Sequence, residues 1–167
     1  MSEAEVNFVK QQGLEDASPL TCDFQYPALM LQPRATLVLV LLGVLFQAAP
    51  LFLALSAVLW WNTLVPALNP FDRLYNAVIA ARRGLPPLLA ARAPRRFAQG
   101  MAATFMLAIG ASLLAGLATL AWALEALLLV ALGALVFGRF CLGSFIFHLL
   151  TGNGAFARRT MPWSRAS

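Results

Sequence analysis

The sequence predicts an all-α integral membrane protein with four transmembrane helices, arranged as two helical hairpins joined by a cytoplasmic amphipathic helix. Of its 167 residues, 60% are hydrophobic and 11% are charged, and the mean hydropathy is +0.76. Soluble domains have about 45–50% apolar and about 25% charged residues. The stretches Ala35–Leu68 and Phe97–Gly138 together contain one charged residue, Glu125. A water-soluble fold of this length cannot bury so much leucine and alanine.

The basic residues are interpreted as topology signals rather than as a nucleic-acid-binding surface. The chain has 12 Lys and Arg against 7 Asp and Glu, which gives a net charge of +5. It has no basic stripe interleaved with aromatic residues and no known reading motif, so no nucleic-acid partner is expected. In membrane proteins, arginines in short loops mark the cytoplasmic side.

Residues 1–33 are predicted to form a polar N-terminal arm that is loosely ordered or lies on a surface. The acidic residues of this arm are opposed only by Lys10. It does not resemble a secretory signal, because the positively charged start is missing and the apolar stretch begins too late. Cys22 lies in the arm and is interpreted as a thiol without a function.

The first apolar stretch is predicted to contain two spans. As one helix, residues 35–68 would be about 51 Å long, whereas the hydrocarbon core is about 30 Å thick. Gln47 is polar, and Pro50 suits the first turn of a new helix. The sequence therefore predicts the spans Arg34–Ala48 and Pro50–Val65. Both are short, so a single tilted span with a re-entrant piece is the alternative.

A surface helix is predicted over residues 70–83. Asn69 is its expected N-cap, Pro70 its first residue and Gly84 its C-cap. An amphipathic helix of this kind suits a membrane surface, and packing of its apolar face against the protein's own helices is the alternative. The apolar face follows helical spacing and consists of Phe71, Leu74, Tyr75, Val78 and Ile79.

The second apolar stretch is predicted to form spans over residues 98–115 and 119–138, with the turn near Gly116. Each is close to the ~20 residues that a bilayer requires. The four-span membrane domain thus covers residues 34–150, and residues 151–167 form a basic C-terminal tail.

The distribution of arginines predicts the orientation. Arginines occur in the central loop and at or after the last span, whereas the two tight turns carry no charge. An odd number of spans would separate these arginine clusters. The positive-inside rule therefore predicts a multi-pass protein of the bacterial inner (cytoplasmic) membrane with both termini in the cytoplasm.

Small side chains at four-residue spacing are predicted to mediate helix packing. They let a second helix approach closely, where van der Waals contact and weak CH···O bonds act. The packing is either internal or a docking stripe for another membrane protein subunit. The residues concerned are Thr104, Ala108, Ser112 and Gly116 in the third span, with Ala134 and Gly138 in the fourth.

Glu125 is the only acidic residue inside the predicted membrane region. Such residues usually face the bundle interior and are candidates for a function. It lies about 9 Å from the outer turn in axial rise. We expect it to be protonated, or hydrogen-bonded to a serine or threonine, rather than ion-paired. A proton or ion path through this residue is the alternative.

The segment RFCLGSFIFHLL, residues 139–150, carries Cys141, Ser144 and the only histidine, His148. On one helix these three residues share a face. Cys141 and His148 would be about 10 Å apart, too far to ligate one metal ion. Further ligands at metal-binding spacing are missing, so neither a metal site nor a cofactor is predicted. His148 is interpreted as an interfacial hydrogen-bonding residue.

Two short motifs resemble a known family. RFAQG at residues 96–100 and FCLGS at residues 140–144 are similar to signature stretches of the bacterial membrane family catalogued as domain of unknown function 4395. The resemblance implies a four-span layout over residues 35–150. It also implies thiol chemistry at the membrane, because members are grouped with thioredoxin-like and sulfur-transfer proteins. The family usually has a second cysteine where this chain has Ser144.

Two functions follow as hypotheses. The first is an accessory or scaffold subunit of a membrane assembly, because no nucleotide loop, catalytic triad or paired carboxylates indicate an independent enzyme. The second is a thiol or sulfur-handling component that acts through Cys141 with a thioredoxin-like partner. Cys141 and Ser144 cannot cycle between dithiol and disulfide. Arg139 favours a thiolate at Cys141, whereas the negative end of the fourth helix, expected nearby, opposes it. Small-solute transport is a weaker third hypothesis.

Overall fold

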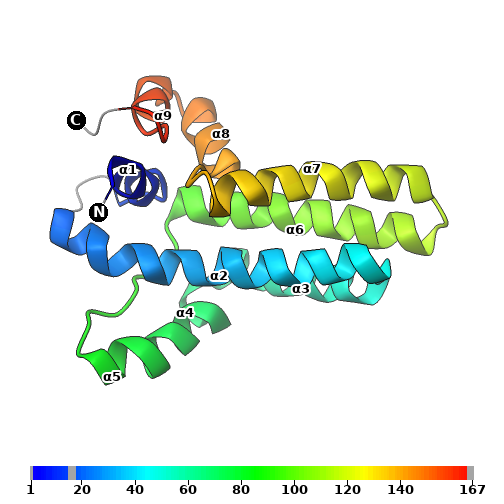
Figure 1. Cartoon of the computed structure of the whole chain (residues 1–167), viewed down its shortest axis with the longest axis horizontal. Helices are drawn as coiled ribbons and strands as arrows, with labels where there is room; N and C mark the ends of the chain where they lie inside the picture. The colour runs from blue at the N-terminus through cyan, green and yellow to red at the C-terminus, as the bar shows by residue number, and fades with distance from the viewer. Residues whose placement is uncertain (1, 15–17, 165–167) are drawn as a thin grey trace.

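The computed structural model describes residues 2–14 and 18–164, and these residues form helices and connecting turns without strands. The chain begins with α1 (Glu3–Gln11), the long α2 (Pro19–Phe46) and α3 (Ala49–Leu64). A 3₁₀ turn, η1 (Pro66–Leu68), leads into the rest of the fold (Figure 1). There follow α4 (Pro70–Tyr75), the π-helical η2 (Asn76–Ala80), α5 (Ala81–Arg83), α6 (Ala93–Leu114), α7 (Ala118–Val136), α8 (Leu142–Leu150) and α9 (Gly154–Arg159).

Helices α2, α3, α6 and α7 lie side by side as a bundle (Figure 1). Helix α3 packs against α6, α6 against α7, α7 against α2, and α2 against α3. The short turns after α2 and after α6 lie at one end of the bundle, and the shorter helices gather around the other end (Figure 1). The core of the bundle includes the buried residues Val40, Phe52, Leu59, Met106, Ile109 and Leu128.

The chain has the helices of a membrane protein. Among the described residues, the segments Leu20–Phe46, Ala93–Leu114 and Ala118–Val136 are long and apolar enough to cross a membrane. Helix α3 is a shorter apolar helix. Large apolar side chains also cover the outside of the bundle, where Leu45 is 73% exposed and Val130 is 72% exposed. Helices that are hydrophobic on all sides are typical of membrane spans.

The first long helix begins at Pro19, so the start predicted at Arg34 is wrong. Ser18 caps the helix, because its hydroxyl accepts a hydrogen bond of 3.2 Å from the backbone N–H of Thr21. The expected loose arm is therefore helical over residues 3–11 and from residue 19 onward. It is also packed, because a second core contains residues of α1, α2 and their neighbours: Phe8, Val9, Cys22, Ala28, Met30, Tyr75 and Leu88.

The chain is helical from Pro70 to Arg83, the range that the sequence predicts. The side chain of Asn69 caps its start, and Gly84 follows its end with a φ of 61°. The predicted apolar face is divided between two environments: Tyr75 is buried in the second core, whereas Leu74 is 57% exposed. Location of this helix on a membrane surface remains a prediction.

Candidate functional site

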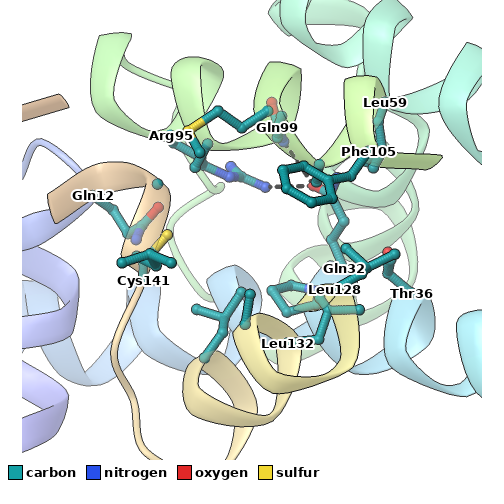
Figure 2. Close-up of a pocket in the computed structure, with 18 of the residues that line it drawn as sticks. Gln12, Gln32, Thr36, Leu59, Arg95, Gln99, Phe105, Leu128, Leu132 and Cys141 are labelled. Carbon is teal, nitrogen blue, oxygen red and sulfur yellow. Dashed lines mark hydrogen bonds between the residues drawn. The ribbon is translucent and has the colours of Figure 1, made fainter. Parts of the chain in front are cut away.

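A cavity of about 380 Å³ lies among α2, α6, α7 and α8 (Figure 2). Gln12, the residue that follows α1, also lines it. Pockets for small molecules commonly have volumes of about 300–1,000 Å³ and mostly apolar walls. The lining here is mainly apolar, with Leu59, Phe105, Leu128 and Leu132 among its residues. Its polar lining residues are Gln12, Gln32, Thr36, Arg95, Gln99 and Cys141.

A buried hydrogen-bonded network forms one part of the cavity wall. The guanidinium of Arg95 donates two hydrogen bonds to the carboxylate of Asp72, at 2.9 and 2.7 Å, and both residues are 6% exposed. Oε1 of Gln32 accepts from Arg95 at 3.1 Å, from Gln99 at 2.9 Å and from Asn69 at 3.2 Å. This two-point pairing compensates the desolvation of both charges. The network joins α2, α6 and the start of α4.

Two glutamines in the cavity wall retain a polar atom without a hydrogen-bond partner. The amide nitrogen of Gln99 donates to Gln32, but its Oε1 has no partner. The Nε2 of Gln12 also has none. Gln12 and Gln99 are only 6% and 7% exposed. A buried polar atom in this state costs about 1–3 kcal/mol.

Cys141 lies in the wall of the same cavity and is the N-cap of α8 (Figure 2). Its backbone N–H donates to Oε1 of Gln11 at 3.0 Å, and the hydroxyl of Ser144 donates to its sulfur at 3.3 Å. Cys141 follows the end of the fourth span, as expected, but it also begins a separate helix that the sequence did not predict. Helix α7 ends at Val136, and the chain turns through Arg139, which has a φ of 54°, before α8 begins. The sulfur therefore lies near the positive end of a helix dipole.

His148 connects α8 to the end of α1. It is 1% exposed, and its Nε2 lies 3.1 Å from the backbone oxygen of Gln11. Its ring contacts Phe147 and Phe156, and its Nδ1 has no hydrogen-bond partner. His148 thus makes a hydrogen bond, as predicted, and its partner is the backbone of α1. Over residues 2–14 and 18–164, no cluster of three or more His, Cys, Asp or Glu side chains could hold a metal ion.

Glu125 is 1% exposed and lies outside the cavity lining. Its carboxylate oxygens accept hydrogen bonds of 3.1 and 3.3 Å from Nε2 of Gln47. The partner is thus a glutamine rather than the expected serine or threonine. Gln47 lies in the turn between α2 and α3 with a φ of 47°, so the pair fastens this turn to α7. The structure does not bring Glu125 and Cys141 into one site.

The predicted stripe of small residues does not form a single packing face. Thr104 is exposed, Ala108 is half-buried and Ser112 is buried. Gly116 lies in the turn after α6, with no atom within 4 Å of an added Cβ. A four-residue repeat drifts by about 40° per step around a helix of 3.6 residues per turn, so the stripe winds from the outer to the inner face. Ala134, near the end of α7, is half-buried, and Gly138, which follows α7, is exposed.

Sequence reasoning missed the polar wall of the cavity. The sequence pattern presents Arg95 as a topology signal, although it is buried and paired with Asp72. Gln32 and Gln99 received no role, although polar residues at the edge of an apolar span are the available signal for such a site. The close approach of α6 to α3 was also missed: a Cβ on Gly110 would lie 2.8 Å from Leu53.

Comparison with known proteins identifies the family but no characterised relative. No curated protein and no solved structure matches the chain. The family model described as "Domain of unknown function (DUF4395)" matches residues 28–151. This region contains Cys141, Ser144 and every residue of the cavity wall that follows residue 28, and it leaves out Gln12. The chain belongs to the DUF4395 family.

Proposed function

We propose that this chain crosses the bacterial inner membrane four times, with both termini on the cytoplasmic side. Helix α3 has 16 residues, about 24 Å at 1.5 Å per residue, which is short against a core of about 30 Å. It packs directly against α6, and its charge-free sequence lets it share the apolar environment of that helix. The uncharged turns at one end and the arginines near the other support this orientation.

We propose that the protein binds a small molecule from the lipid phase in the cavity described above. The observation that carries this proposal is the cavity itself, which has a volume of about 380 Å³ and a largely apolar wall. Protein interiors are close-packed, so a purely structural helix bundle would be expected to leave no cavity of this size. The role is accessory rather than catalytic, with other membrane proteins as partners.

Photolabelling in lipid nanodiscs tests this proposal. A dodecane that bears a diazirine should label cavity residues of α6 and α7, located by mass spectrometry. Ala131 lines the cavity, so Ala131→Phe should fill it and strongly reduce this labelling. Ala126 is exposed on the same helix and does not line the cavity, so Ala126→Phe is the matched control. Labelling that spreads over all outer surfaces, unchanged by Ala131→Phe, would refute the binding function.

A thiol function at Cys141 is the second candidate, favoured by the position of the sulfur. The residue caps α8, its sulfur accepts a hydrogen bond of 3.3 Å from the hydroxyl of Ser144, and it lines the cavity while being only 5% exposed. A thiolate there would attack a small disulfide, form a mixed disulfide and release the other half as a thiol. Because Ser144 cannot resolve the bond, a thiol of a thioredoxin-like partner would have to do so.

Reagents of different size test this second candidate in a Cys22→Ser background. Methyl methanethiosulfonate is small enough to enter the cavity and should modify Cys141. A maleimide carrying a polyethylene glycol chain should not, because the thiol is buried. Cys141→Ser supplies the control for both reagents. A thiol that resists the small reagent in the folded protein would leave Cys141 with a structural role alone.

A further inference from the structure

We infer that α1 is a lid over Cys141 that must open before a protein partner can reach the thiol. This inference rests on the proposed function and specifies how access to the same site is controlled. It follows from the position of α1 over the thiol, from the burial of that thiol, and from the tighter attachment of the other element that covers it.

Helix α1 covers the part of the cavity wall in which Cys141 lies. Phe8 of α1 and Gln12, which follows the helix, both line the cavity, and Figure 2 shows Gln12 and Cys141 at one side of it. The side chain of Gln11 accepts a hydrogen bond of 3.0 Å from the backbone N–H of Cys141. Cys141 also belongs to the second core, together with Phe8 and Val9. Displacement of α1 would therefore uncover the thiol.

A thiol on a folded partner cannot reach Cys141 while α1 is in place. To resolve a mixed disulfide on Cys141, the partner's thiolate would attack the sulfur of the small half, form a new disulfide with it and release Cys141 as a thiolate. Such an exchange requires access to the disulfide, yet Cys141 is only 5% exposed. A small reagent can enter through the cavity, but the surface of a folded protein cannot. An element that covers Cys141 must therefore move.

The packing of α8 on α6 identifies α1 as the element that moves. A Cβ on Gly143 of α8 would lie 2.7 Å from the Cα of Ala98 of α6. The hydroxyl oxygen of Ser144 lies 3.3 Å from the backbone oxygen of Pro94. Helix α8 is thus held closely against the bundle. Helix α1 is not one of the four bundle helices (Figure 1), so its displacement leaves the contacts among α2, α3, α6 and α7 in place.

The contacts that fasten α1 can be weakened without changing Cys141. The side chain of Asn7 donates hydrogen bonds to the backbone oxygens of Met161 and Ser164, at 3.1 and 2.9 Å. The ring of Phe8 packs edge-on against Tyr26, with ring centroids 5.9 Å apart. Proteins open locally, and lids belong to the segments that open at a lower free energy than the whole fold. Substitution of Asn7 or Phe8 should therefore increase the fraction of open lid.

Labelling of Cys141 by the maleimide that carries polyethylene glycol tests the lid, with the full chain in nanodiscs and in the Cys22→Ser background. The parent protein should react very slowly. Phe8→Ala should raise the rate roughly ten- to hundredfold, as expected from the loss of a buried aromatic ring. Asn7→Ala should raise it by roughly fivefold or more, from the loss of two hydrogen bonds. Asn7 does not line the cavity, so this second increase reports movement of α1 rather than a larger cavity.

Phe52→Ala is the matched control for Phe8→Ala. Phe52 is also fully buried, but it lies in the core of the bundle and does not line the cavity. The substitution should destabilise the bundle and leave the labelling rate of Cys141 unchanged. Circular dichroism and size-exclusion chromatography report that each variant is folded.

Hydrogen exchange measures the same opening without a thiol reagent. The amides of residues 7–12 should exchange together and faster than those in the middle of α6, because α1 opens while the bundle stays closed. Asn7→Ala should accelerate this exchange by the same factor as it accelerates labelling, since both rates then depend on one opening equilibrium.

The outcomes separate the lid from the binding function. If folded Phe8→Ala and Asn7→Ala proteins label as slowly as the parent, or if Phe52→Ala accelerates labelling as much as Phe8→Ala, α1 is not a lid. Exchange of α1 only together with the bundle would also refute the lid. If the variants expose Cys141 as expected but the photoreactive dodecane does not label the cavity, the lid is supported and the binding function is wrong.

Discussion

At the scale of single residues, the structure depends on buried polar groups that share partners across helices. Gln32 gives one carbonyl oxygen to three donors, one of them the charged Arg95. The sequence presents these residues in three separate segments, so neither their proximity nor the ion pair with Asp72 could be predicted from spacing. Glu125 and Cys141 were recognisable as unusual residues in apolar surroundings, but their partners, Gln47 and Gln11, also come from distant segments.

The ion pair gives the first prediction of stability. Asp72→Asn removes the negative charge and leaves the guanidinium of Arg95 buried without compensation. Loss of one partner of a buried pair typically costs about 3–5 kcal/mol, and we expect a loss of that size in unfolding measurements in mild detergent.

The surface pair of the same chain is the control for that prediction. Arg139 and Glu5 lie 3.3 Å apart, with side chains that are 37% and 18% exposed. Exposed pairs contribute about 0–1 kcal/mol, so Glu5→Gln should have a small effect. Equal losses for Glu5→Gln and Asp72→Asn would contradict the dominant role of the buried pair.

At the scale of helices, elements with local start and stop signals were predictable. The predicted segments 50–65 and 119–138 differ by only one or two residues at each end from α3 and α7, and the helix over 70–83 has its predicted range. The start of α2 was missed because residues 19–33 contain polar residues and the prolines Pro27 and Pro33. Those residues are helical because their apolar side chains are buried against α1 and the helix after Asn69. That tertiary contact is not visible in the local sequence.

The contact between α3 and α6 gives a prediction for two glycines. A Cβ on Gly110 would lie 2.8 Å from Leu53 and 3.3 Å from the backbone oxygen of Ala49. Gly110→Ala should therefore destabilise the protein by about 1–3 kcal/mol, as overpacking does. Gly133 has no atom within 4 Å of an added Cβ, so Gly133→Ala should be neutral or slightly stabilising. Thermal unfolding in detergent compares the two variants, and a reversed order would refute this packing.

The winding of the small-residue stripe gives a second prediction at this scale. Ser112→Leu should lower the melting temperature, because Ser112 is 5% exposed inside the bundle. Thr104 is exposed, and its hydroxyl bonds only to the carbonyl of Gly100 in its own helix. Thr104→Leu should therefore be tolerated in the isolated protein. If Thr104→Leu instead disrupts a complex with another membrane protein, the exposed half of the stripe is a docking surface.

At the scale of the whole molecule, charge and apolar surface are separated along the bundle. The two short turns carry no charged residue, whereas the segment between α3 and α6 and the segment after α7 carry most of the arginines. Composition alone was enough to predict a helical membrane protein. The cavity was not predictable, because its wall combines residues from α1 to α8 whose proximity depends on how the bundle closes.

The number of spans gives the last prediction, and single cysteines in a Cys22→Ser, Cys141→Ser background test it. The substituted residues Glu3, Ala81, Ala115 and Ala155 are all exposed. With four spans, an impermeant maleimide should label Ala115→Cys in intact cells and the other three only after permeabilisation. If α3 is re-entrant instead of spanning, residues 3 and 81 lie on opposite sides of the membrane. The decisive comparison is therefore Glu3→Cys against Ala81→Cys. Equal protection of both supports four spans, because α2 and α3 must then cross in opposite directions, and unequal labelling would establish that only three helices cross.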